Sequence, residues 1–235
     1  MSNDIEQLNE NEQSEDSIIS LMDMRARTYG MLARLFREEI DKEELEELQG
    51  MRFPTATGNA EVDAGYRSLY DYLRTAWDDS ITELAIDFVR TFIGHGVNGY
   101  SAAYPFESVY TSERRLMMQE ARAEVLQTLR ENNLKSGRWN EGEDHIGLEL
   151  EFMQRMSMRT ADDLRSGDED AAIKKLETQQ TFVHDHLLNW LPMLVADMQK
   201  FSKTKFYQGL GQLALGFVKE DAQTLAELLE VDEES

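Results

Sequence analysis

The stretch WNEGEDHIGLELEFM, residues Trp139–Met153, places five acidic side chains around one histidine, His145, at the start of an apolar pattern. The apolar residues recur at intervals of three and four, which is typical of an amphipathic helix. Asp144 precedes that pattern, where an aspartate commonly caps a helix and acids favour the helix dipole. The cluster can be a helix cap, a metal site, a catalytic dyad, or part of a surface that binds a basic partner.

Capping does not account for Glu149. On a helical wheel that starts at Ile146, the apolar stripe covers about 240° to 340° and Glu149 lies at about 300°, in the middle of that stripe. A buried carboxylate there must be paired, hydrogen-bonded or neutralised. An internal pair with His145, one turn away on the same face, is one solution. In the other, the two residues order a loop that holds a ligand.

Helical periodicity continues through nearly the whole chain, and no run alternates apolar and polar residues for long enough to predict a strand. We therefore predict an all-α fold, a single domain of about eight to ten helices. Its expected limits are residues 18–221. They are flanked by an acidic disordered tail at 1–17 and a short helix with an acidic tail at 222–235.

Local signals predict where individual helices begin and end. The first helix is expected from about Ile18, a reciprocal cap between Asp41 and Glu44 opens the second, and Ser80 caps the helix at 81–94. Helical pattern is also expected at 112–133, 169–190, 205–219 and 222–229, and Pro192 should end or kink the helix before it.

Composition excludes several classes of function. The formal charge is −22, with six acids in residues 1–17 and seven in 220–235, which leaves −9 for residues 18–219. Nucleic acids require a basic surface, so this acidity indicates a basic peptide or protein as the partner. The chain has no cysteine, which excludes disulfides, thiolate zinc sites and thiol catalysis.

Targeting signals are absent from the sequence as given. The N-terminal residues have no basic start and no apolar run, and no segment has the uninterrupted apolar length of a membrane span. We therefore expect a cytoplasmic protein that does not span a membrane.

Two short motifs are weak. GHGVNG, residues 94–99, matches the glycine pattern of dinucleotide sites, but it follows a helix and opens a loop instead of joining a strand to a helix. His184 and His186 point about 200° apart on a helix, so they cannot share a metal ion. We expect no cofactor and no metal from either motif.

A second unusual stretch is SAAYPFESVYTSE, residues 101–113. Tyr104, Phe106 and Tyr110 surround Glu107 in a segment too broken to be a core helix. Such aromatic side chains either fill the core beneath a loop or line a groove for a peptide with arginine and apolar residues. The sequence leaves both alternatives open.

These stretches together resemble the TorD/DmsD family of chaperones for molybdenum reductases. The family's Glu-Pro-x-Asp-His string is similar to Glu141–His145, with Gly142 in place of the proline. YPFESVYTSE resembles the family's Pro-aromatic-x-Ser-Val loop. YGMLARLF, at residues 29–36, resembles its first-helix signature, and the run from Phe182 to Asp221 resembles its C-terminal pattern.

The resemblance implies a TorD-like helical fold that exists as a monomer or homodimer, with domain swapping as one form. It implies an assembly chaperone that binds the twin-arginine signal peptide of an apo-molybdoenzyme of the DMSO or TMAO reductase type. The chaperone would hold that enzyme until cofactor insertion, before Tat export. The expected peptide-binding residues are Tyr104, Pro105, Phe106, Glu107, Ser108, Glu141, Asp144, His145 and Glu149.

Holding a peptide makes and breaks no bond, so this hypothesis assigns no catalytic residue and no cofactor. The alternative is a metal-dependent helical enzyme centred on Glu141, Asp144, His145 and Glu149. A third hypothesis is a purely structural acidic adaptor, which would not distinguish arginine from lysine in its partner.

Overall fold

The computed structural model describes residues 2–54, 56–94, 101–135 and 141–233. These ranges contain ten α-helices, two π-helical segments and one isolated β-bridge, with no strand, which confirms the all-α prediction. The helices are α1 (Ser2–Arg37), α2 (Lys42–Gly50), α3 (Ala60–Leu73), α4 (Asp78–Phe88), α5 (Glu107–Thr111), α6 (Glu120–Glu131), α7 (Ile146–Arg165), α8 (Glu169–Phe182), α9 (Leu191–Phe201) and α10 (Lys205–Glu233). The π-helical segments are η1 (Val89–Ile93) and η2 (Val183–Leu188).

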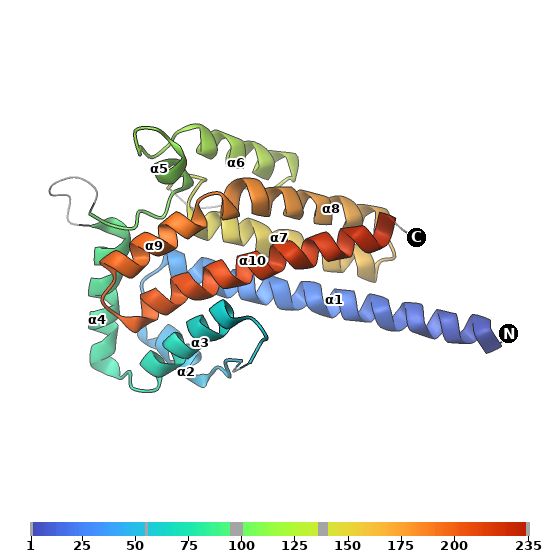
Figure 1. Ribbon diagram of the computed structural model, residues 1–235, viewed down its shortest axis with the longest axis horizontal. Coiled ribbons are helices and arrows are strands. Elements are labelled where there is room, and N and C mark those ends of the chain that lie inside the picture. Colours follow the sequence, from blue (N-terminus) through green and yellow to red (C-terminus); the bar gives the residue numbers. More distant parts are fainter. Residues whose placement is uncertain (1, 55, 95–100, 136–140, 234–235) are drawn as a thin grey trace.

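The long helices lie lengthwise beside one another, as Figure 1 shows. α1 packs along α7, and α3 packs along α10, while α7 and α10 both contact α8. α4 crosses the end of this bundle, and the pair α5 and α6 lies along one side (Figure 1). None of the helices in the described ranges is long and apolar enough to cross a bilayer.

The contact between α3 and α10 depends on a glycine. A Cβ atom at Gly65 would lie 2.6 Å from the backbone nitrogen of Leu213. Any side chain there would separate the two helices, so glycine is required for space and not for an unusual backbone conformation.

A buried polar cluster joins α1 to α10. Arg25 donates two hydrogen bonds to Asp221, of 2.5 and 2.9 Å, and the Tyr29 hydroxyl donates a third of 2.6 Å. All three side chains are buried. Burial, followed by the negative charge of Asp221, raises the pKa of Tyr29 well above its usual value. Every carboxylate oxygen of Asp221 has a donor, as a buried charge requires.

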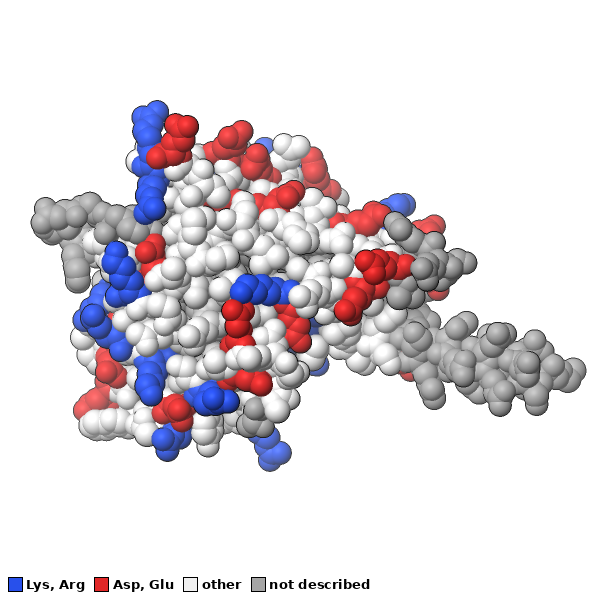
Figure 2. Space-filling view, in the orientation of Figure 1, with Lys and Arg blue, Asp and Glu red and all other residues white. Residues whose placement is uncertain are grey.

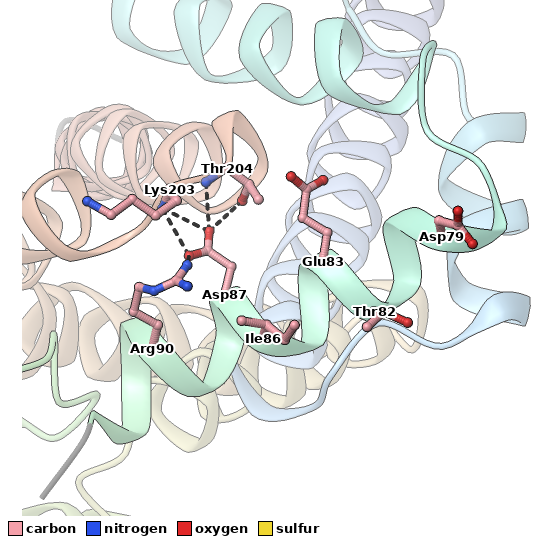
Figure 3. A pocket seen from close by; sticks show the side chains of 8 residues that line it. All are labelled: Asp79, Thr82, Glu83, Ile86, Asp87, Arg90, Lys203 and Thr204. Atoms are coloured by element: carbon pink, nitrogen blue, oxygen red, sulfur yellow. Dashed lines mark hydrogen bonds and ion pairs between the residues drawn. The ribbon is translucent and has the colours of Figure 1, made fainter.

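A second buried carboxylate fixes the start of α10 (Figure 3). Asp87 on α4 accepts hydrogen bonds from the backbone N–H groups of Lys203 and Thr204, from the Thr204 hydroxyl, and from Arg90. Lys203 and Thr204 immediately precede α10, so their backbone N–H groups have no acceptor within that helix. Asp87 therefore ties α4 to the N-terminus of α10.

Several helix limits differ from the predicted ones. α1 begins at Ser2, ahead of residue 18, and α10 continues to Glu233 where two helices are expected. α10 does not break at 220–221 because Asp221 is neutralised by Arg25 inside the bundle. The proposed limits of the acidic tails stay a prediction.

The predicted caps are partly correct. Asp41 accepts a hydrogen bond of 2.8 Å from the Glu44 backbone, but the Glu44 side chain pairs with Arg34 instead of returning to Asp41. Ser80 does not cap α4, because the helix begins one turn earlier. Trp77 is the N-cap residue, and its N–H donates to the Ser80 hydroxyl at 3.1 Å.

The predicted helix at 112–133 is shorter than expected. α6 begins only at Glu120, because Arg115 and Met118 adopt positive φ angles of 52° and 59°, outside the right-handed helical region. The expected helix at 169–190 becomes α8 followed by η2, and Pro192 lies in the first turn of α9, where a missing N–H is tolerated.

We predict that Asp221→Asn strongly destabilises the bundle. The substitution removes the charge that neutralises buried Arg25, and breaking a buried ion pair in this way costs about 3–5 kcal/mol. The free energy of unfolding measured in urea should fall accordingly. Glu227→Gln, at an exposed position on the same helix, is the control and should change stability little. Equal stability of the two variants would contradict this role for Asp221.

Candidate functional site

The two stretches singled out in the sequence meet in the structure. The Glu107 N–H donates to the Asp144 carbonyl and the Ile146 N–H donates to the Pro105 carbonyl, both at 2.9 Å. Phe106 and His145 form an antiparallel bridge, and their rings pack edge to face. The loop before α5 and the loop before α7 are therefore paired through their backbones.

His145, and not Asp144, is the N-cap of α7. Its Nδ1 atom accepts a hydrogen bond of 3.0 Å from the Gly147 N–H. Because Nδ1 must carry no proton to accept that bond, the cap requires a neutral ring. Burial and then the nearby positive charge of Arg37 lower the pKa of His145 to about 3, which keeps the ring neutral at physiological pH.

Asp144 is fully buried and binds the opposite loop. One of its carboxylate oxygens accepts hydrogen bonds from the Ser108 N–H, at 3.0 Å, and from the Ser108 hydroxyl. The other, Oδ1, has no hydrogen-bond partner among the described residues. A Cβ atom at residue 142 would lie 2.6 Å from this Oδ1 atom. Gly142, where the family has proline, therefore leaves space for the Asp144 carboxylate.

Glu149 obtains its hydrogen bond from Trp190 and not from the expected His145. The Trp190 indole N–H lies 3.1 Å from Glu149 Oε2 and also contacts the His186 carbonyl. Burial, followed by the charges of Glu107 and Asp144, raises the pKa of Glu149 well above 4.5. A neutral carboxyl resolves the cost of placing Glu149 on the apolar stripe of α7.

Glu107 is held by two residues that the sequence did not indicate as partners. Its Oε2 lies 3.0 Å from His186 Nδ1, and its Oε1 accepts a 3.0 Å hydrogen bond from Asn189. The structure gives His186 a buried carboxylate neighbour. The only sequence signal for this pairing was an unexplained acid between aromatic residues in the loop.

Glu107 also borders an acidic surface hollow. This hollow, of about 510 Å³, lies between α5 and α6, and it adjoins another of about 540 Å³ between α6 and η2; both are lined by Glu124 and Asn189. We call the two together the acidic groove. The acidic residues that line it are Glu107, Glu113, Glu120, Glu124, Glu131 and Asp185. Figure 2 shows acidic side chains gathered over α6, with basic ones beside them.

The residues expected to bind a peptide differ in access to this groove. Among them only Glu107 lines it. Glu141 is exposed and Tyr104 is half-buried. The others are buried in the junction of the two loops: Pro105, Phe106, Ser108, Asp144, His145 and Glu149. Phe106 therefore fills the core beneath the loop, while half-buried Tyr110 stacks on Trp190.

The metal-enzyme alternative gains no support from the described part of the chain. No group of three or more His, Asp or Glu side chains there is placed to hold a metal ion. The glycine motif at 94–99 lies, apart from Gly94, outside the described residues, as do Trp139 and Asn140 of the opening stretch. Another hollow, of about 570 Å³, surrounds Asp87 (Figure 3), but Asp87 is already fully hydrogen-bonded to the start of α10.

Comparison with known proteins assigns the class. The family model for nitrate reductase delta subunits matches residues 57–196, more than half of the chain. The chain belongs to this family, which includes the TorD chaperones, and the resemblance predicted from the sequence is confirmed. Membership in this family identifies the protein as a chaperone of molybdoenzyme maturation.

Individual relatives agree with this assignment over nearly their whole length. The chaperone protein TorD of Vibrio atlanticus is 28% identical over 211 residues, which is 87% of this chain and 95% of the relative. TorD of Vibrio cholerae is 28% identical over 217 residues, covering 89% and 96%. A crystal structure from Archaeoglobus fulgidus, assigned to redox enzyme maturation, shares the fold with a TM-score of 0.50 and 15% identity, covering 83% of this chain and 94% of that one.

We predict that Glu149→Gln makes the protein less sensitive to alkaline pH. Folded Glu149 keeps its proton above pH 4.5, whereas the unfolded chain releases it, so the wild type loses stability as pH rises beyond that value. The loss is at most about 1.4 kcal/mol per pH unit. Between about pH 5 and about pH 8, the free energy of unfolding measured in urea should increase for the variant relative to the wild type. Parallel pH profiles would contradict a neutral Glu149.

His145→Asn should act in the opposite pH range. Asparagine keeps the capping acceptor but cannot be protonated. Because the pKa of folded His145 is about 3 and its ordinary value is 6.5, the unfolded wild type takes up a proton below pH 6.5 and the folded protein does not. Wild-type stability should therefore fall as the solution is acidified, and the variant should lack this component. Urea unfolding of both proteins at a series of pH values below about 6.5 measures this difference in stability.

Proposed function

We propose that this protein is a cytoplasmic assembly chaperone that binds the twin-arginine signal peptide of an apo-molybdoenzyme of the DMSO or TMAO reductase type. It would hold that enzyme until its cofactor is inserted, before Tat export. The observation that carries the proposal is the acidic groove, which has the buried carboxylate Glu107 at its wall. No step of this function requires a catalytic residue of the chaperone.

The chemistry of the groove suits paired guanidinium groups. Glutamate carboxylates accept charge-assisted and bidentate hydrogen bonds from arginine, which lysine cannot reproduce. Glu107 is already oriented by His186 and Asn189, so little conformational freedom would be lost when a guanidinium binds it. The exposed glutamates on α6 supply a negative field that speeds the encounter and is screened by salt.

The buried acids of the site have a supporting role in this proposal. Asp144 fixes Ser108, the neighbour of Glu107, and His145 holds the start of α7 against the same loop. Asp144→Ala or His145→Ala would then weaken peptide binding by displacing Glu107. The proposed peptide-binding set thus contains one residue on the groove wall, Glu107, and a buried frame behind it.

We predict that Glu120→Gln combined with Glu124→Gln weakens the binding of a synthetic peptide with two consecutive arginines followed by leucine and alanine. Both glutamates are exposed on α6 and line the groove. Removing two such charges should raise the Kd about tenfold, a difference of about 1.4 kcal/mol. Isothermal titration calorimetry at low salt measures the effect.

The control is Glu43→Gln with Glu47→Gln, which removes the same charge at the same helical spacing on exposed α2. This double variant should leave the Kd for the Arg-Arg peptide nearly unchanged. A second peptide, with lysines in place of the arginines, should bind the wild type weakly. If both double variants lost the same binding affinity, the effect would come from the overall charge and not from the groove. If the Arg-Arg and Lys-Lys peptides bound equally well, the acidic adaptor hypothesis would be favoured.

A further inference from the structure

The segment Arg114–Met118, Arg-Arg-Leu-Met-Met, has the same chemistry as the peptide proposed above: two consecutive arginines followed by apolar residues. We call it the strap. It lies between α5 and α6, where the sequence pattern predicts a helix and the structure has none. Its three apolar side chains are 47%, 42% and 55% exposed. Three adjacent exposed apolar residues are unusual on a protein with this charge, so burial in the core does not explain the segment.

The strap lies at the mouth of the acidic groove. Arg114 lines the same hollow as Glu107, Glu113, Glu120 and Glu124. Within the described ranges, the Arg114 side chain forms no hydrogen bond or ion pair. A guanidinium therefore stands beside several carboxylates without being fixed to any one of them, which is a weak and reversible form of electrostatic contact.

Local hydrogen bonds hold the backbone of the strap, since the Arg115 N–H donates to the Ser112 carbonyl at 3.1 Å and the Gln119 amide donates to the Met117 carbonyl at 2.9 Å. The Leu116 N–H, in the middle of the strap, donates a 3.0 Å hydrogen bond to the Ser112 hydroxyl. After the strap, the Gln119 N–H donates at 3.2 Å to the Ser108 hydroxyl, which is itself bonded to buried Asp144. Arg115 and Met118 adopt positive φ angles, which non-glycine residues rarely do. Displacement of the strap would break these few local bonds and would relieve the strain of the two positive φ angles.

We propose that the strap is an internal pseudo-leader that occupies the mouth of the acidic groove in the free chaperone and is displaced by the arginine pair of the client. This inference rests on the proposed function and adds its regulation. Because the strap competes from within the same chain, it lowers the apparent affinity by the fraction of time that it covers the groove. That fraction is the same for every ligand, so the strap lowers all apparent affinities by one factor and raises the intrinsic affinity that a client needs in order to bind.

The first test needs no peptide. Hydrogen–deuterium exchange of residues 113–118 reports how firmly the strap is seated. If Arg114 is attracted by the groove, Glu120→Gln with Glu124→Gln should make these amides exchange about threefold to tenfold faster, because a charge contact of this kind is worth only a small factor. Glu43→Gln with Glu47→Gln should not change their exchange. Equal exchange in both variants and the wild type overturns the proposal, whatever the peptide experiments show.

The second test measures competition. Arg114→Ala should bind the synthetic Arg-Arg peptide about threefold to tenfold more tightly than the wild type, because the internal competitor is weakened. Arg52→Ala is the control, since Arg52 is also exposed and lies in the loop between α2 and α3, away from the groove. The Lys-Lys peptide should gain the same factor from Arg114→Ala as the Arg-Arg peptide, because the strap covers the groove for the same fraction of the time in both experiments.

The outcomes separate the two proposals. If the wild type binds the Arg-Arg peptide and Arg114→Ala binds it equally or more weakly, the strap is no competitor, while the proposed function stands. If neither protein binds the peptide, the proposed function falls, and the exchange experiment alone decides whether the strap is seated in the groove. Faster exchange of residues 113–118 on addition of the peptide to the wild type supports displacement.

Discussion

Three carboxyl groups, from Glu107, Asp144 and Glu149, are buried at one junction, and the protein must neutralise or hydrogen-bond each of them. Removing a carboxylate from water is costly unless donors replace the lost solvent. The chain meets this need in three ways. Asp144 receives the N–H and hydroxyl of Ser108, Glu107 receives Asn189 and faces His186, and Glu149 takes up a proton. Each solution requires another element to be in place, so the junction fixes α5, α7 and η2 together.

The π-helical turn η2 brings two of these partners to the same point. His186 and Trp190 both reach the buried acids, and the Trp190 indole also bonds the His186 carbonyl at 2.5 Å. π-helical turns interrupt the regular helix and occur frequently at functional sites. Here the interruption ends α8, places Asn189 beside Glu107 and begins α9 at Leu191. An uninterrupted helix through residue 190 would present these side chains at different angles.

Some of this organisation could be predicted from the sequence and some could not. Helical periodicity is a property of local segments, so the all-α fold and the presence of a buried acid at Glu149 followed from spacing alone. The partner of Glu149 did not, because Trp190 is 41 residues away and a wheel of one helix includes only its own residues. The helix cap was assigned to Asp144 in place of His145 for the same reason: Ser108 of the distant loop binds the Asp144 carboxylate, which leaves the histidine to cap α7. The strap was not predicted because its sequence pattern is typical of a helix, whereas two of its residues have positive φ angles that a right-handed helix does not allow.

Glu107 connects the buried junction with the surface, since it is the member of that junction that also lines the acidic groove. A neutral Glu149 adds no second negative charge against it, and His186 and Asn189, which also line the groove, hold its two oxygens. On the α6 side of the groove, the exposed glutamates would attract cations but hold them loosely. A guanidinium that reaches Glu107 would gain a fixed, partly desolvated partner, whereas one that stops at α6 would gain only a screened charge. Under the proposed function, this difference between the wall and the rim would let the groove prefer arginine over lysine.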